Sequence, residues 1–271
     1  MYVNAIKEGT DYVRPLVTGK VTYENRQILN IINSLMILNS DGDCLTCAHI
    51  AELFQAAEDT NEVFSDILKQ IKHSSKREIK KIEEKYGIKK DTIIRIHNIV
   101  VDVAKNIDKI DIIKHPYLDL AIIKLHEKVN IKNFPIFNTE DIKIGTSILN
   151  LGYAFPEYDT FKYDLEKERM IVTNKVMNFP LFPSPGIITR NIIDPKNELS
   201  LFETNAPCYP GQAGGPVLNV EGEVIGLTLA SKIIKIHDTQ NSSYTVELSA
   251  AIKSKTITEF LDENNITYTK R

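Results

Sequence analysis

Short β-prone segments separated by turns constrain the fold of this chain more than any other feature. Residues 17–22 and 28–38 are rich in β-branched and apolar types, and an Asp41-Gly42 turn precedes the next such segment at 44–49. Glycine, asparagine and aspartate punctuate the later segments, which lie at 92–103, 118–125, 147–151, 187–189, 201–204, 217–218, 224–230 and 244–248. The pattern predicts many short strands in two halves, as in an all-β barrel or sandwich.

Two segments break this strand pattern with a helical period. From about 51 to 86 the apolar residues recur on one helical face, with lysine, arginine and glutamate between them. We interpret this segment, about 51–90, as a helical insertion with a solvated outer face; the alternative is a dedicated partner-binding surface. A second helical pattern at 250–264 closes the chain. Residues 155–186 are charged and then proline-rich, which predicts a long functional surface loop.

Composition excludes several classes of protein. The 271 residues include 33 basic and 36 acidic side chains, so no strong field favours nucleic acid or an anionic membrane as partner. No apolar run reaches the roughly 18 residues of a membrane-spanning helix. The N-terminal residues lack the pattern of a secretory signal, and three cysteines are too few for a disulfide framework. We therefore expect a reducing, cytoplasmic location.

Three short motifs carry the chemistry. The segment Pro210-Gly-Gln-Ala-Gly-Gly-Pro216 holds three glycines within five residues, and successive amides in such a turn can converge on a negative charge. His49 ends an apolar strand just before the helical segment. Asp119 opens a nearly continuous apolar run, where a carboxylate is costly unless a group such as a histidine N–H bonds it. Each motif taken alone also fits a structural role.

Taken together and in order, the motifs read Thr-Cys-Ala-His, Asp-Leu-Ala-Ile and Gly-Gln-Ala-Gly-Gly-Pro. This series resembles the chymotrypsin-like serine peptidases, and more closely the bacterial HtrA-like trypsin-like peptidases. The flanks agree too, as in Leu151-Gly152-Tyr153 and Gly222-Glu223-Val224. The resemblance implies two six-stranded β-barrels with the site in the cleft between them. Residues 1–135 would form the first barrel with its helical insertion, and 136–271 the second barrel with the long loop and the closing helix.

The resemblance also implies the site roles. His49 would be the general base, Asp119 its orienting acid, and the amides of Gly211 and residue 213 the oxyanion hole. In this fold the pocket for the residue before the scissile bond would be lined by two stretches: Pro207, Cys208, Tyr209, Leu229, Ala230 and Ser231. No acid stands among them, so we expect a small or apolar residue there. The implied activity is a serine endopeptidase acting on protein or peptide substrates.

One position departs from this pattern. Ala213 stands where the family has its nucleophilic serine, and a methyl group has no lone pair to attack a carbonyl. The chain as given should therefore be inactive. Two explanations compete: an engineered Ser-to-Ala change, which we favour because the remaining motif residues are intact, and a natural pseudo-protease that binds peptides or proteins.

Other ligands and partners are expected as follows. Cys44 and Cys47 have a zinc-like spacing, but no second pair of ligands follows, and alternation along a strand would point the two away from each other. We expect no metal and no cofactor. A regulatory protein bound through the helical insertion remains a hypothesis.

Overall fold

The computed structural model describes residues 2–24, 26–103, 110–154, 161–164, 166–167, 169–172, 181–194, 196, 198, 200–237 and 243–271. Strands dominate, with four helices among these residues. None of the described helices is both long and apolar enough to cross a bilayer. The three cysteines, Cys44, Cys47 and Cys208, are buried and unpaired.

The first half of the chain forms a six-stranded antiparallel sheet with the order β4-β1-β2-β3-β6-β5. Its strands are β1 (Val13–Thr22), β2 (Ile28–Ile37), β3 (Asp43–Thr46), β4 (Ile93–Val100), β5 (Asp111–Lys114) and β6 (Ala121–Lys124). Buried aliphatic side chains such as Leu16, Leu35 and Ile122 contribute to the hydrophobic core. Within the described residues its two edge strands, β4 and β5, do not pair with each other.

The second half closes into a barrel. Its strands are β7 (Ile136–Phe137), β8 (Ser147–Tyr153), β11 (Leu181–Ile192), β12 (Leu201–Thr204), β13 (Pro216–Leu218), β14 (Val224–His237), β15 (Ser243–Lys253) and β16 (Thr269–Lys270). Six of them run β13-β8-β11-β12-β15-β14, and a further β13–β14 pairing closes this ring, while β7 and β16 extend the sheet beyond β14. The predicted all-β architecture is thus confirmed.

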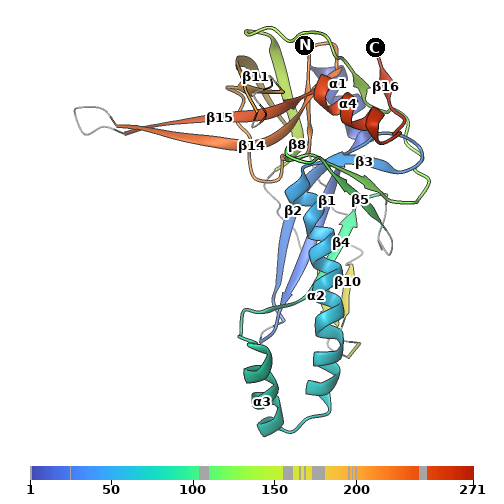
Figure 1. Cartoon of the computed structure of the whole chain (residues 1–271), viewed down its shortest axis with the longest axis vertical. Helices are drawn as coiled ribbons and strands as arrows, with labels where there is room; N and C mark the ends of the chain where they lie inside the picture. Colours follow the sequence, from blue (N-terminus) through green and yellow to red (C-terminus); the bar gives the residue numbers. More distant parts are fainter. Residues whose placement is uncertain are drawn as a thin grey trace.

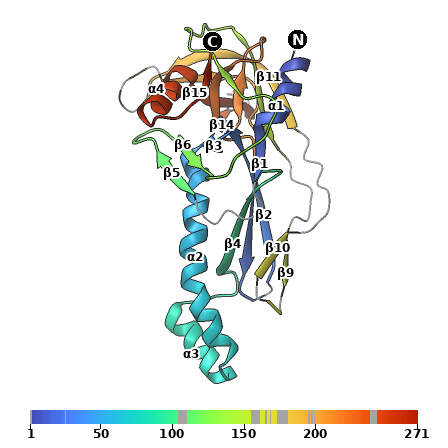
Figure 2. The same ribbon diagram turned by 90° about the vertical axis from the view of Figure 1, so that its right-hand side faces the viewer.

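Helices are added around the two sheets. Helix α1 (Val3–Tyr12) precedes β1 and was not predicted. Helices α2 (Ala48–Lys72) and α3 (Lys76–Tyr86) form the insertion, which extends away from the barrels as an arm (Figure 1). Helix α4 (Ser254–Glu263) closes the second barrel; it begins four residues later than predicted, because 250–253 continue β15. Figure 2 shows α2 running alongside β4 before the arm reaches past the sheet.

The predicted loop at 155–186 was only partly right. Residues 155–160, 165, 168 and 173–180 lie outside the described part of the chain, but the others form β9 (Phe161–Asp164), β10 (Arg169–Val172) and the start of β11. Pro183 and Pro185 suggested a loop, yet both lie in β11, opposite Leu151 and Leu149 of β8. Among the described residues, β11 pairs on one edge only at these positions, which is where a strand tolerates proline.

Candidate active site

His49 lies in the first turn of α2, not at the end of a strand as the sequence suggested. Strand β3 ends at Thr46, Cys47 is the N-cap residue, and the helix begins at Ala48. Only one residue therefore separates the end of β3 from the helix that carries the histidine. The imidazole is half exposed, with 54% of its side-chain surface accessible.

Asp119 bonds this histidine twice. Its Oδ2 lies 2.7 Å from His49 Nδ1, and its Oδ1 accepts the His49 backbone N–H at 2.9 Å. The backbone N–H of Ala48 also lowers the pKa of this carboxyl group by hydrogen bonding. One carboxylate thus serves as a partner for the imidazole and as an acceptor for the otherwise unpaired amides at the start of α2.

The protonation equilibria follow from this contact. The hydrogen bond that His49 donates to Asp119 is the main cause that raises the pKa of His49 above its ordinary value, against the opposing effect of burial. Burial alone would raise the pKa of Asp119, but the hydrogen bonds from the ring and backbone of His49 outweigh it and lower this pKa. Both shifts favour the ion pair of imidazolium and carboxylate.

The glycine-rich loop lies beside β2, and Ser34 fixes it there. The Ser34 hydroxyl donates to the carbonyl of Gly211 at 2.8 Å and accepts the N–H of Tyr153 at 2.9 Å. The Ser34 backbone N–H donates to the carbonyl of Ala213 at 3.1 Å. A fully buried serine on the first sheet therefore holds three points of the second half of the chain.

Gly214 explains why this loop needs glycine. Its φ of +84° lies in the left-handed region, and a Cβ here would overlap the carbonyl oxygen of Ser34 and the hydroxyl of Thr46. The Gly214 N–H donates to the carbonyl of Thr228 at 2.9 Å, and the Thr228 N–H donates back to the carbonyl of Gly215 at 2.9 Å. These bonds tie the loop to β14.

The two halves of the site meet at the carbonyl of Thr228. This oxygen accepts the Gly214 N–H and also the thiol of Cys47, whose Sγ lies 3.4 Å away. Gly214 adjoins Ala213, and Cys47 lies two residues before His49. The structure therefore brings the three motifs together, with Ala213 partly exposed. Among the described residues, the amides of Gly211 and Ala213 have no hydrogen-bond acceptor.

The predicted pocket residues fall on both sides of this loop. Cys208 is buried, Pro207, Tyr209 and Leu229 are partly exposed, and Ala230 and Ser231 are exposed. The ring of Tyr209 meets Phe182 of β11 edge to face, with centroids 5.2 Å apart. Ala250 of β15 lies opposite Ala230, a neighbour that the sequence analysis did not include.

The sequence analysis also missed two positioning residues. Ser34 was one of them, although a polar residue inside an apolar strand was an available signal. Gln212, buried in the loop, accepts the Tyr209 N–H at 2.8 Å and donates to the Phe182 carbonyl at 2.7 Å. The side-chain amide of Gln212 therefore links the loop to Phe182 of β11.

A metal site was also tested against the geometry. Potential ligand atoms of Cys47, His49 and Asp119 lie within 4.8 Å of one another. Burial, the largest cause, raises the pKa of the Cys47 thiol well above its ordinary value, and the thiol donates a hydrogen bond to the carbonyl of Thr228. A metal needs the thiolate, and the other two groups are bonded to each other. This donor set therefore fits a hydrogen-bonded site better than a metal centre.

The comparisons with known proteins agree with this fold. The profile of the trypsin-like peptidase domain family matches residues 34–227, most of the chain, so the chain belongs to that family.

Within the family, the relatives are HtrA-like serine peptidases. The chain is 23% identical over 146 residues to the mitochondrial serine protease HTRA2 of Bos taurus, covering 54% of this chain and 26% of that protein. It is 30% identical over 115 residues to a probable periplasmic serine endoprotease, DegP-like, of Chlamydia muridarum, covering 42% and 19%. The chain thus spans about a quarter or less of the length of these relatives.

Among solved structures, the HtrA-type protease AlgW with a decapeptide superposes with a TM-score of 0.54 at 16% identity. The match covers 97% of this chain and 67% of that one. At this identity the match establishes a shared fold.

Proposed function

We propose that the serine-213 form of this chain is an endopeptidase that hydrolyses peptide bonds through residues 49, 119 and 213. The observation that carries the proposal is the 2.7 Å contact between His49 and Asp119 beside a loop whose amides at 211 and 213 are free. Membership of the trypsin-like peptidase family supports it.

The chemistry follows from the roles of these groups. The Asp119 carboxylate accepts the Nδ1 proton of His49, which leaves Nε2 as the basic nitrogen. Nε2 would remove the proton of a serine hydroxyl at 213 as that oxygen attacks the substrate carbonyl. The same proton then passes to the leaving amine, and water releases the acyl group by the reverse sequence. The amides of Gly211 and residue 213 would stabilise the oxyanion, where one such donor is worth roughly 2.7–4 kcal/mol.

The chain with Ala213 should bind substrate without cleaving it. No nearby group replaces the hydroxyl, because the Cys47 thiol is buried and its pKa is raised. The competing proposal is a natural pseudo-protease that uses the same cleft for binding; the intact pair of His49 and Asp119 favours the peptidase.

Substituting Ala213→Ser and treating the protein with a fluorophosphonate probe tests this proposal. We expect labelling at residue 213, found by mass spectrometry of the digested protein. The matched control, Ala213→Ser with His49→Ala, should label far more slowly. If the folded Ala213→Ser protein takes no label and cleaves no peptide, the proposal of a peptidase is wrong and the alternative, a pseudo-protease that binds peptides or proteins, is favoured.

The residue before the scissile bond would sit between Pro207–Tyr209 and Leu229–Ser231, and we propose that it is small or apolar. The pairing of Ala230 with Ala250 supports this, because both residues of this cross-strand pair have small apolar side chains. Hydrolysis by the Ala213→Ser form of matched peptides with alanine, leucine, lysine or aspartate at this position measures the preference.

We further propose that a regulatory protein binds the arm formed by α2 and α3. Residues 66–91 hold nine lysines and arginines against five acids, in a chain that is acidic overall. The acids are largely engaged: Glu78 forms a capping box with Ser75, and Glu83 accepts the hydroxyl of Tyr23. All five basic residues of α3 are exposed, and none has an ion-pair partner in the described part of the chain. They are Lys76, Arg77, Lys80, Lys81 and Lys85.

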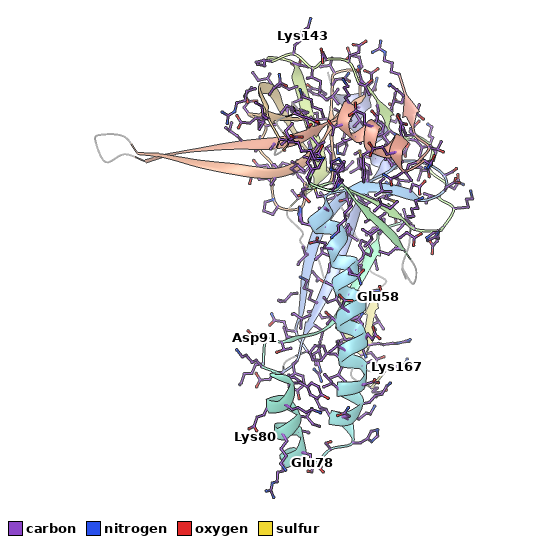
Figure 3. The ribbon with its side chains drawn as sticks, viewed as in Figure 1. Glu58, Glu78, Lys80, Asp91, Lys143 and Lys167 are labelled. Atoms are coloured by element: carbon purple, nitrogen blue, oxygen red, sulfur yellow. The ribbon has the colours of Figure 1, made fainter. Side chains whose placement is uncertain are left out.

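Figure 3 places Lys80 and Glu78 at the far end of the arm, remote from the barrels. Replacing residues 69–89 with a short Gly/Ser linker removes α3 but keeps Leu68, which packs on Val21 and Ile94 of the first sheet. We expect this variant to fold and label normally as Ala213→Ser, but to lose the partner in co-purification from the source cells. Retention of every partner would refute this role for the arm.

A further inference from the structure

The loop between β5 and β6 carries Asp119 in a turn that His115 closes. The His115 backbone N–H donates to the carbonyl of Leu120 at 2.8 Å. The Leu120 N–H donates to the carbonyl of Leu118 at 2.8 Å, two residues earlier, so Asp119 is the central residue of a γ-turn. The His115 side chain adds a third bond, because its Nδ1 lies 3.2 Å from the backbone nitrogen of Leu118. Both the backbone and the ring of His115 therefore hold the turn that presents Asp119.

The bond to Leu118 fixes the protonation state of the His115 ring. A backbone N–H can only donate, so Nδ1 accepts this bond and carries no proton. The Tyr117 N–H donates to the same nitrogen at the longer distance of 3.5 Å. Burial is the largest cause that lowers the pKa of His115 below its ordinary value, so the folded loop favours the neutral ring. The ring of His115 is thus an acceptor at neutral pH, with its one proton on Nε2.

Aromatic rings pack against this imidazole. Its centroid lies 4.6 Å from that of Tyr117 and 5.0 Å from that of Phe260 in α4, both edge to face. Phe260 is buried, and the Nζ of Lys196 lies 3.9 Å from the centroid of the Tyr117 ring. The orientation of His115 is therefore set by α4 and by its own loop, and in this orientation Nδ1 faces the Leu118 N–H.

Charged groups from two other segments act on the ring. Glu263 at the end of α4 and Asp194 in the loop between β11 and β12 favour a proton on His115, while Lys196 of the same loop opposes it. Burial outweighs the two acids, because the pKa is lowered. A proton on Nδ1 would turn the acceptor into a donor that faces the Leu118 N–H, so proton uptake favours an opened turn as the pH falls.

We propose that His115 is a positioning residue for Asp119: its unprotonated Nδ1 holds the γ-turn that directs the carboxylate at His49, and a proton on that nitrogen opens the turn. This inference rests on the proposed function and adds an acid-sensitive control of the same site. The alternative is that the His115 ring only fills space between Tyr117 and Phe260. The two roles differ in what they need, which is an acceptor atom in the first case and a ring in the second.

Two substitutions in the Ala213 chain separate these roles. His115→Asn keeps an acceptor on the γ-carbon and loses the ring, whereas His115→Phe keeps a ring and loses the acceptor. We expect the His49 pKa, followed by NMR titration, to stay raised in His115→Asn and to fall toward about 6.5 in His115→Phe. The control, His126→Asn, replaces an exposed histidine bonded to Asp111 and should change nothing. The opposite order, or no change in either variant, would overturn the proposal.

Acid titration gives a test that does not depend on the folding of His115→Phe. The signal followed is the NMR resonance of the His49 Nδ1–H that Asp119 accepts. In the parent chain we expect it to be lost at the pH where the ring signals of His115 report proton uptake. In His115→Asn it should persist to lower pH, until Asp119 itself is protonated, because an amide does not titrate. Loss of the resonance at the same pH in both chains contradicts the inference.

Kinetics in the Ala213→Ser background separate the ways of failing. We expect kcat to fall up to about 100-fold in His115→Phe with KM unchanged, because a small misplacement of Asp119 slows the reaction without touching substrate. His115→Asn should keep most of the activity at neutral pH. An undiminished kcat in His115→Phe overturns this inference and leaves the peptidase standing. If Ala213→Ser itself cleaves no peptide and takes no label, the proposed function is wrong, and the two NMR tests still decide the role of His115.

Discussion

The two halves of the candidate site are held in place by different means. The half from the first sheet consists of side chains: His49 and Asp119 are both partly exposed and bond each other. The half from the second barrel is backbone: the loop at 210–216 is set by buried carbonyls, by Ser34 and by glycines that permit close contact. The pKa values of the first half therefore depend on the contact between two charged side chains. The conformation of the second half depends on close packing of its backbone.

This comparison predicts distinct responses to mutation. A change in the side-chain half should alter reactivity with little effect on folding, because its groups are partly solvated. A change in the backbone half should alter folding first, because nothing there can move aside.

The largest effect is expected for Asp119→Asn in the Ala213→Ser background. The amide would present a donor to His49 Nδ1 and favour the wrong tautomer, so kcat should fall about 10³–10⁴-fold. The remaining amide oxygen can still accept the backbone N–H of His49, and the unfolding midpoint in urea should change little. A loss of activity below tenfold would show that Asp119 does not orient the base.

Gly214→Ala should have the largest effect on stability. The new methyl group would overlap the carbonyl of Ser34 in a loop with positive φ, and we expect a loss of about 3 kcal/mol or more in urea unfolding. The control is Gly145→Ala, which also has a positive φ, +88°, but open space around the added carbon. It should lose only about 1 kcal/mol. Equal losses would mean that conformation, not close contact, governs the loop.

Ser34→Ala probes the link between the two halves. It removes the donor to the Gly211 carbonyl and the acceptor of the Tyr153 N–H, both buried. We expect about 1–3 kcal/mol of destabilisation, and slower labelling in the Ala213→Ser background because the loop shifts. Ser74→Ala, which removes an exposed hydroxyl bonded to Gln70 on the arm, should stay within about 0.5 kcal/mol. If Ser34→Ala changes neither the stability nor the labelling rate, Ser34 does not position the glycine-rich loop.

The smallest effect concerns pH. The pKa of His49 is raised by Asp119, so NMR titration of the Ala213 chain should place it above the ordinary value of about 6.5. The associated stability is fully present below the unfolded-state pKa and declines as the pH rises through the folded-state value. Asp119→Asn should return the His49 pKa toward 6.5 or below. If the His49 pKa is unchanged in that variant, Asp119 is not the cause of its raised value.

Much of the fold and site could be predicted because it depends on local chemistry. The motifs around His49, Asp119 and Gly214 need particular residue types at particular spacings, so they are visible in the sequence. The strand containing Pro183 and Pro185 was not visible, since its tolerance of proline depends on which edge has a partner. The role of Ser34 was missed for a similar reason: its partners lie more than 100 residues away.

Helix α1 and the long hairpin of β14 and β15 also could not be predicted from the sequence. Short strands and helices with mixed composition take their form from what they pack against, and residues 224–230 gave no sign that β14 continues to His237. Sequence patterns therefore predicted the central chemistry better than the projections around it.

The double engagement of Asp119 couples two assembly events. The same carboxylate completes the first turn of a 25-residue helix and aligns the ring two residues into it. Formation of the first turn of α2 and orientation of the His49 ring therefore depend on the same carboxylate. A fragment or fusion that frays the root of α2 would leave a well-formed barrel with its acid and base out of register.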